Sequence, residues 1–223
     1  MTTSSPVVRD LGLTDYLSVC EAMRLFTQIR TPLTPDEIWF VEHPAIYTAG
    51  RDTVQRPDHI GTVPLISVER GGDITYHAPG QMVVYPLLNL RRRGLFVKSY
   101  VHLLLQSLIE TLSAYNIAAF THPHAPGVYV HLNGGIGEFK GLAKIASIGI
   151  RISRGCSYHG IALNVDMDLS GFRRIAPCGY SGLRMTDMAS LLETRVNLHD
   201  VKTDYRLNLL KALSIASNIN HHD

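Results

Sequence analysis

Hydrophobic residues recur at helical spacing in three parts of the chain. Between residues 13 and 30, Val19, Met23 and Phe26 share one face, which predicts an amphipathic helix that ends before the prolines of "TPLTP". The spacing also predicts a closing helix over residues 199–216. The clearest stripe, over residues 97–116, consists of Val101, Leu104, Leu105, Leu108, Leu112 and Tyr115.

The middle of the chain has the short apolar runs of β-strands. These runs are "EIWFVEH", two runs within residues 65–88, "GVYVHL", "KIASIGIRI" and "HGIALNV". The Asn-Gly-Gly sequence in "NGGIGEFKG" predicts a hairpin loop. Asp187 or Thr186 is expected to cap a short helix that runs to Leu192. Strands in the middle with helices outside predict one α+β domain, a mixed sheet flanked by helices. We expect it to span residues 12–216, between a flexible N-terminus (1–11) and a frayed tail (217–223).

Composition and charge narrow the class of protein. The 223 residues are 45% hydrophobic and 18% charged, as in ordinary globular proteins. The net charge of +2 gives no overall field suited to nucleic acid or a membrane. Local basic clusters at Arg91–Arg93 and Arg173–Arg174 are candidates for docking an acidic partner.

Targeting signals and disulfides are not expected. The N-terminal "MTTSSPVVRD" lacks the apolar region of a signal peptide, and no apolar run reaches the roughly 18 residues of a membrane span. The three cysteines, Cys20, Cys156 and Cys178, are odd in number and far apart. We therefore expect a cytoplasmic protein with reduced thiols.

Two loops and one strand carry candidate chemistry. The stretch "RGGDITYHAPGQ" (70–81) contains more polar groups than a turn between strands requires, although a turn remains an alternative. It matches neither a phosphate loop nor a dinucleotide fingerprint. Cys178, between Pro177 and Gly179, lies in a turn sequence, so it is either structural or a nucleophile activated by a nearby base.

Lys144 interrupts the apolar run "GLAKIASIGI". If the run is a regular strand, Lys144 shares a face with Ala146, Ile148 and Ile150. One reading is a strand-end lysine whose ammonium reaches water. The other is a desolvated lysine that acts as a general base for Cys178.

Metal binding is not expected. Cys156 and His159, or His122 and His124, have spacings that could serve a metal, but no second pair stands at a zinc-ligand interval from either. His159 is expected to form hydrogen bonds at the mouth of a cleft.

Four motifs together resemble one family, the lipoyl(octanoyl) transferases. They are "EHPAIYTAGR" (42–51), "RGGDITYHAPGQMVVYPL" (70–87), "KIASIGIRISRGCSYHGIALNV" (144–165) and "FRRIAPCGYSGLRMTDM" (172–188). The similarity extends over about residues 12–210. One departure is the long "HLNGGIGEFKGLA" hairpin (131–143), which can be much shorter in other members.

The resemblance implies the fold of biotin- and lipoate-protein ligases, with an acyl tunnel. It implies a catalytic dyad of Cys178 and Lys144. It implies acyl contacts at Arg70, Gly71, Gly72, Asp73, Ile74, Thr75, Tyr76, His77, Ser147, Ile148, Gly149, Gly160, Ile161 and Ala162.

The implied reaction needs no cofactor of its own, because the acyl group arrives on the phosphopantetheine of acyl carrier protein. Octanoyl (or lipoyl) would pass to Cys178 as a thioester and then to a lysine of a lipoyl domain. The implied partners are octanoyl-acyl carrier protein, the lipoyl domains of 2-oxoacid dehydrogenase complexes and the glycine cleavage H protein, with the enzyme a monomer. Two alternatives stay open: an ATP-dependent lipoate or biotin ligase on the same fold, and a non-enzymatic acyl-binding module.

Overall fold

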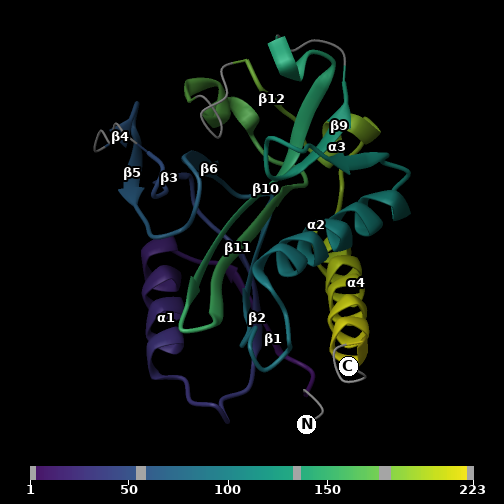
Figure 1. Ribbon diagram of the computed structural model, residues 1–223. Coiled ribbons are helices and arrows are strands. Elements are labelled where there is room, and N and C mark those ends of the chain that lie inside the picture. The colour runs from purple at the N-terminus through teal and green to yellow at the C-terminus, as the bar shows by residue number, and fades with distance from the viewer. Residues whose placement is uncertain (1–3, 54–58, 133–136, 176–181, 220–223) are drawn as a thin grey trace.

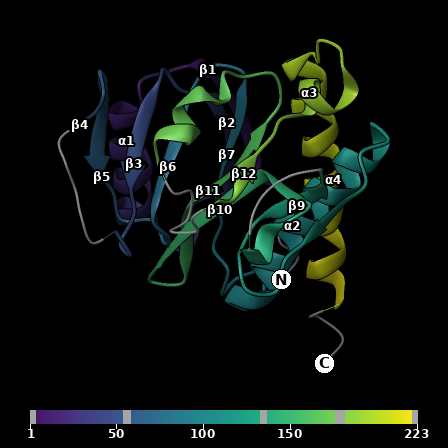
Figure 2. The same cartoon turned by 90° about the horizontal axis from the view of Figure 1, so that it is seen from above.

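The computed structural model describes residues 4–53, 59–132, 137–175 and 182–219 of the chain. These residues form a large β-sheet with helices on both of its faces and a smaller sheet beside it (Figures 1 and 2). The predicted mixed sheet flanked by helices is therefore confirmed. Within the described ranges, no helix combines the length and apolar character needed to cross a membrane.

The large sheet mixes parallel and antiparallel neighbours. Its order is β1-β2-β7-β11-β10-β9-β8, and β12 pairs with β10 off this path. The pairs β1–β2 and β10–β12 are parallel, and the other pairs are antiparallel. The strands are β1 (Val7–Leu13), β2 (Glu37–Glu42), β7 (Gln81–Leu87), β8 (Ala119–Thr121), β9 (Val128–His131), β10 (Leu142–Ser153), β11 (Cys156–Asn164) and β12 (Arg184–Met185).

Strand β1 corrects the expectation that residues 1–11 are a flexible terminus. From Val7 onward the chain pairs in parallel with β2, at the edge of the sheet. Arg9 holds this edge by two hydrogen bonds to the Glu37 carboxylate, at 2.5 and 2.8 Å. Most residues of β1 are exposed, so the strand lacks the apolar alternation that a sequence pattern detects.

The smaller sheet has the order β4-β5-β3-β6. Its strands are β3 (Ile46–Ala49), β4 (His59–Ile60), β5 (Val63–Ser67) and β6 (Ile74–His77). Tyr47, Tyr76 and Phe172 pack in the cluster behind it, with ring centroids 5.0 Å apart for the two tyrosines and 5.5 Å for Tyr76 and Phe172. This packing fixes the segment before β6, which carries the first part of the candidate site.

Helices cover the two faces of the large sheet unequally. α2 (Val97–Ala114) and α4 (Leu198–Ile219) cover one face and bury the main apolar core, whereas α1 (Tyr16–Ile29) covers the other (Figure 1). The short helix α3 (Met188–Leu192) is capped by Asp187, whose carboxylate accepts from the Ser190 N–H, so Asp187 and not Thr186 is the cap of the two that the sequence offered. The 3₁₀ turns are η1 (Gly137–Phe139) and η2 (Leu169–Arg174). α4 continues past residue 216, so the expected frayed tail is helical up to Ile219.

One of the two basic clusters serves the fold. The buried Asp36 carboxylate accepts from Arg30, Arg92 and Arg93, each at 2.6 Å, and from the Asn89 N–H at 2.8 Å. Arg93 is itself buried. The cluster ties the start of β2 to the end of β7. This use of Arg92 and Arg93 weakens their expected role as a free docking surface for an acidic partner.

We predict that Asp36→Asn lowers the free energy of unfolding by about 3–5 kcal/mol, because it leaves buried arginines uncompensated. Burial alone would raise the pKa of Asp36, but the Asn89 N–H and the charges of Arg93 and Arg92 outweigh it and hold the pKa below its usual 3.8. The stabilisation is therefore complete above pH 3.8 and lost as pH falls through the lower, folded-state pKa. Urea unfolding of the variant at pH 7 and acid unfolding of the wild type measure both effects.

The matched control is Asp166→Asn. The Asp166 carboxylate lies 3.4 Å from the guanidinium of Arg195, whose side chain is 94% exposed. An exposed pair of this kind contributes about 0–1 kcal/mol. Equal losses for the two variants would show that the Asp36 cluster is not a buried network.

Candidate active site

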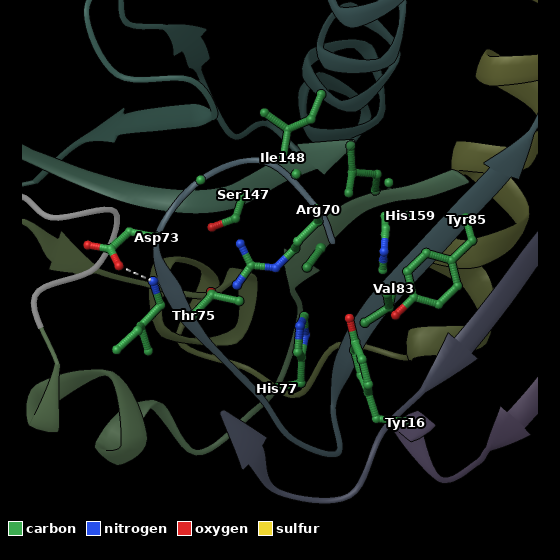
Figure 3. Close-up of a pocket in the computed structure, with 16 residues that line it drawn as sticks. Tyr16, Arg70, Asp73, Thr75, His77, Val83, Tyr85, Ser147, Ile148 and His159 are labelled. Carbon is green, nitrogen blue, oxygen red and sulfur yellow. Dashed lines mark hydrogen bonds between the residues drawn. The ribbon is translucent and has the colours of Figure 1, made fainter. Parts of the chain in front are cut away.

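A narrow cavity of about 50 Å³ lies between α1, β6, β7 and the β10–β11 hairpin (Figure 3). The sequence analysis named twelve of its lining residues: Arg70, Gly72, Asp73, Ile74, Thr75, His77, Ser147, Ile148, Gly149, Gly160, Ile161 and Ala162. Three segments of the sequence, within residues 70–77, 147–149 and 160–162, are thus brought together in one pocket. Its remaining lining residues, which the sequence analysis did not assign to an acyl site, are Tyr16, Val83, Tyr85 and His159.

Two of the expected contact residues do not line the pocket. Tyr76 packs instead against Tyr47 and Phe172 behind the smaller sheet. Gly71 supports the loop, because its N–H donates to the Ile150 carbonyl at 3.1 Å. Both residues therefore position the loop rather than face the cavity.

Arg70 crosses the pocket as a buried guanidinium. It donates to the Thr48 carbonyl at 2.6 Å, to the Thr48 hydroxyl at 2.8 Å and to the Gly71 carbonyl at 3.0 Å. These bonds join β3 to the loop that precedes β6. The result is a fixed positive charge in the wall of an otherwise largely apolar cavity.

Glycines make two close approaches possible, that of β11 to β7 and that of β10 to the Arg70 side chain. Gly149 and Gly160 are paired in the ladder. A Cβ at Gly160 would lie 1.9 Å from the Val84 carbonyl oxygen, and one at Gly149 would lie 3.0 Å from Cδ of Arg70. The expectation that small residues occur here thus has a steric reason.

Neutral aromatic and imidazole groups form one end of the pocket. His43 lies behind this end, and its Nδ1 donates to the Thr14 carbonyl (2.7 Å), so its Nε2 accepts from the Tyr85 hydroxyl (2.9 Å). His77 Nδ1 donates to the Gln81 amide oxygen (2.7 Å). Burial, together with the neighbouring His43, lowers the pKa of His77 to about 3. Burial also raises the pKa of Tyr16 and of Tyr85, so these groups are uncharged at neutral pH.

His159 differs from the other two histidines. It is 1% exposed, which corrects the expectation that it lies at the mouth of a cleft. Neither of its ring nitrogens has a hydrogen-bond partner in the described part of the chain. The pKa of His159 is lowered to about 3, mainly by burial and to a smaller extent by the charge of Arg70. A stacked Tyr158 ring, 5.0 Å between centroids, covers it.

Lys144 is fully buried, so a strand-end lysine that reaches water is excluded. Its Nζ donates to the Pro126 carbonyl at 2.8 Å and lies 5.6 Å from the centroid of the Tyr129 ring. Gly127, at φ 142°, makes room for it, because a Cβ there would lie 2.4 Å from Cε of Lys144. The amine is therefore held in one place.

The prediction that Lys144 shares a face of its strand with Ala146, Ile148 and Ile150 is wrong. Lys144 pairs with Tyr129 and Ala146 with Val128, so the register between β10 and β9 shifts between them. This β-bulge reverses the alternation of side chains between the two faces of β10. Ala146 joins the core under α2 and α4, and Ile148 and Ile150 pack against it, whereas Lys144 lies beside Tyr129, which belongs to a separate cluster.

Strand β12 brings the segment after the candidate cysteine next to Lys144. Met185 pairs with Lys144, and the Thr186 N–H donates to the Lys144 carbonyl at 3.0 Å. Cys178 lies outside the described residues, and its proximity to Lys144 stays a prediction. The two described cysteines have structural surroundings: Cys156 is buried in β11, and burial raises the pKa of Cys20 on α1. No cluster of three or more metal-ligand side chains occurs among the residues that the structure describes.

Comparison with known proteins identifies the family. The family profile of the lipoyl protein ligase A/B catalytic domain matches residues 20–208. An octanoyltransferase of Pseudomonas putida (strain W619) is 48% identical over 211 residues, covering 93% of this chain and 92% of its own. One of Cupriavidus necator is 51% identical over 187 residues, covering 82% and 67%.

The chain belongs to the octanoyltransferase family. It is accordingly an acyltransferase, as the four motifs predicted. A crystal structure of lipoate-protein ligase A bound with ATP has a TM-score of 0.70 at 14% identity, covering 94% of this chain and 86% of the other. A biotin protein ligase from Aquifex aeolicus has a TM-score of 0.53 at 11% identity, covering 96% and 72%. At such identities the likeness concerns the fold alone, and the predicted ligase-like fold is confirmed.

Proposed function

We propose that this acyltransferase moves an octanoyl group from acyl carrier protein to a lysine of a lipoyl domain, through a thioester on Cys178. The observation that carries the proposal is the 48% identity to an octanoyltransferase over nearly the whole of both chains. A second support is the pocket itself, whose apolar wall suits a medium-length acyl chain. Each buried methylene contributes about 0.8 kcal/mol to such binding.

In the first half-reaction Lys144 takes the proton of the Cys178 thiol. The thiolate attacks the carbonyl carbon of the donor thioester, a new C–S bond forms, and the bond to pantetheine sulfur breaks. The pantetheine sulfur leaves with the proton that Lys144 returns. One thioester replaces another, so this step is nearly balanced in free energy.

In the second half-reaction the target lysine amine attacks the acyl-enzyme. A C–N bond forms, the C–S bond to Cys178 breaks, and the proton lost by the amine passes through Lys144 to the cysteine sulfur. An amide is more stable than a thioester, so this step makes the transfer irreversible. The Pro126 carbonyl and the Tyr129 ring hold the Lys144 amine in one position. This supports the role, because a group that carries a proton must stay within hydrogen-bond reach of the groups that give and take it.

We propose that the acyl chain of the substrate lies along β10, with its carbonyl group near Lys144 and its hydrocarbon part in the pocket. Ser147, Ile148 and Gly149 follow Lys144 on this strand, and Gly160, Ile161 and Ala162 face them from β11. The expected acyl contacts from residues 70–77 close the pocket from the other side.

The test of the function is transfer without ATP. We expect purified protein, octanoyl-acyl carrier protein and an unmodified lipoyl domain to give the octanoylated domain, measured by its intact mass, with no ATP present. The same protein with free octanoate and MgATP is expected to give none. Modification only with free acid and ATP would identify a ligase, and binding of octanoyl-acyl carrier protein without transfer would identify an acyl-binding module.

A further inference from the structure

A second hollow, of about 350 Å³, lies where the β10–β11 hairpin turns beside the end of α1. Its lining residues come from three segments, within residues 27–32, 89–92 and 154–156. Figure 1 shows this turn at the opposite end of the hairpin from β12. Among the described residues, the hollow and the acyl pocket have no lining residue in common. Its volume lies within the range of sites that hold a small molecule, about 300–1,000 Å³.

Positive charge is concentrated in this hollow. Its described lining residues include no acid and four arginines, which are Arg30, Arg91, Arg92 and Arg154. The nearby Asp36 carboxylate pairs with two of them, Arg30 and Arg92, and is shared with Arg93. Arg91 and Arg154 form no ion pair within the described ranges. Such an excess of guanidinium over carboxylate attracts an anion.

Arg30 offers a buried donor to this hollow. Its side chain is 3% exposed, and its Nε has no hydrogen-bond partner in the described part of the chain. Its other two nitrogens donate to the Asp36 carboxylate at 2.6 Å and to the Leu87 carbonyl at 3.2 Å. A buried N–H without an acceptor is unfavourable, so the Nε of Arg30 points to an acceptor that a ligand supplies.

Arg91 and Arg154 are exposed, but contacts with the backbone hold both of them at the hollow. Arg154 donates through Nη2 to the carbonyls of Thr27 and Gln28, at 2.7 and 2.6 Å. Arg91 lies against Gly155, where a Cβ would be 2.6 Å from its Nε and 2.7 Å from its Cδ. The planar fork of an arginine held in this way can bind an oxyanion through two parallel hydrogen bonds.

We infer that this hollow is a binding site for the phosphate group of a small molecule, with Arg30, Arg91 and Arg154 as its donors. A phosphate group has several acceptor oxygens and carries up to two charges, so it can accept from more than one guanidinium. The burial of Arg30 favours a compact ligand group over the broad surface of an acidic protein. Lys144 lies nine residues before the end of β10, about 30 Å along the strand. The site is therefore separate from acyl transfer and does not rest on the proposed function.

The test is calorimetric binding of inorganic phosphate and of glycerol 3-phosphate to the whole chain, at a constant ionic strength of about 0.1 M. We expect a dissociation constant of about 1 mM or lower for at least one of them. Arg91→Gln is expected to weaken this binding by about 10-fold or more, because it removes a charge-assisted donor. Arg91→Lys keeps the charge and loses the fork, so its affinity is expected to be intermediate. The probe that binds more tightly identifies the ligand as the phosphate ion or as a phosphate ester.

The matched control is Arg206→Gln, which removes the same charge from an exposed position on α4. Its affinity for phosphate is expected to stay within about 2-fold of the wild type, because salt screens distant surface charges. The melting temperature of Arg91→Gln without phosphate checks its folding and should equal or exceed that of the wild type, since Arg91 is exposed. Three results would each overturn the inference: no saturable binding of either probe up to about 10 mM, equal weakening in Arg91→Gln and Arg206→Gln, or tighter binding of a polyglutamate peptide than of either probe.

Discussion

Replacing Cys178 by serine is expected to lower octanoyl transfer by about 10³-fold or more, because a hydroxyl is far less acidic than a thiol and Lys144 would form little of the anion that attacks the donor thioester. The rate is measured as the appearance of octanoylated lipoyl domain with octanoyl-acyl carrier protein as donor. Binding of the donor is expected to persist, since the substitution removes one sulfur and leaves the pocket wall intact.

The matched controls are the other two cysteines. Cys20→Ser and Cys156→Ser are expected to keep most of the activity, because Cys20 packs on α1 and Cys156 is buried in β11. The raised pKa of Cys20 also leaves little thiolate at neutral pH. If Cys178→Ser is as active as the wild type, Cys178 is not the nucleophile.

Replacing Lys144 by methionine is expected to lower kcat by about 10²–10⁴-fold, the range over which a positioned acid–base group acts. Methionine is similar in length and apolar, so it should fill the buried site beside Tyr129 without a cavity. The effect should therefore appear in kcat, with the melting temperature equal to or above that of the wild type.

Lys140 offers a control lysine four positions earlier in the chain. It is exposed, so Lys140→Met removes the same charge from a solvated site and should leave kcat unchanged. Equal activity of Lys144→Met and Lys140→Met would reduce Lys144 to a structural residue.

The sequence predicts well those elements that pack an apolar face. The stripe from Val101 to Tyr115 places α2 correctly, and the Asp187 cap places the start of α3. Strand β1 escapes prediction because an edge strand with most residues exposed leaves no apolar pattern. The strand face on which Lys144 lies is not predicted correctly, because a β-bulge reverses the alternation of side chains and this bulge depends on the pairing with β9.

The site is predictable only in part, for a similar reason. The motifs identify the loop from Arg70 to His77 and the two central strands. Tyr16, Val83 and Tyr85 join the pocket from α1 and β7, where their spacing is that of ordinary core residues. The burial of His159 and its left-handed backbone depend on how Tyr158, Tyr85 and Arg70 pack around it, which no local pattern encodes. The Asp36 cluster likewise joins residues up to 57 positions apart.

The central claim is the thioester on Cys178, and intact mass spectrometry tests it most directly. After incubation with octanoyl-acyl carrier protein alone, the wild type should gain the mass of one octanoyl group, and peptide mapping should place it on Cys178. Addition of a lipoyl domain should discharge it, and Cys178→Ser should show no gain. A group mapped to Cys20 or Cys156, or full transfer with no acyl-enzyme under rapid quenching, would contradict the account.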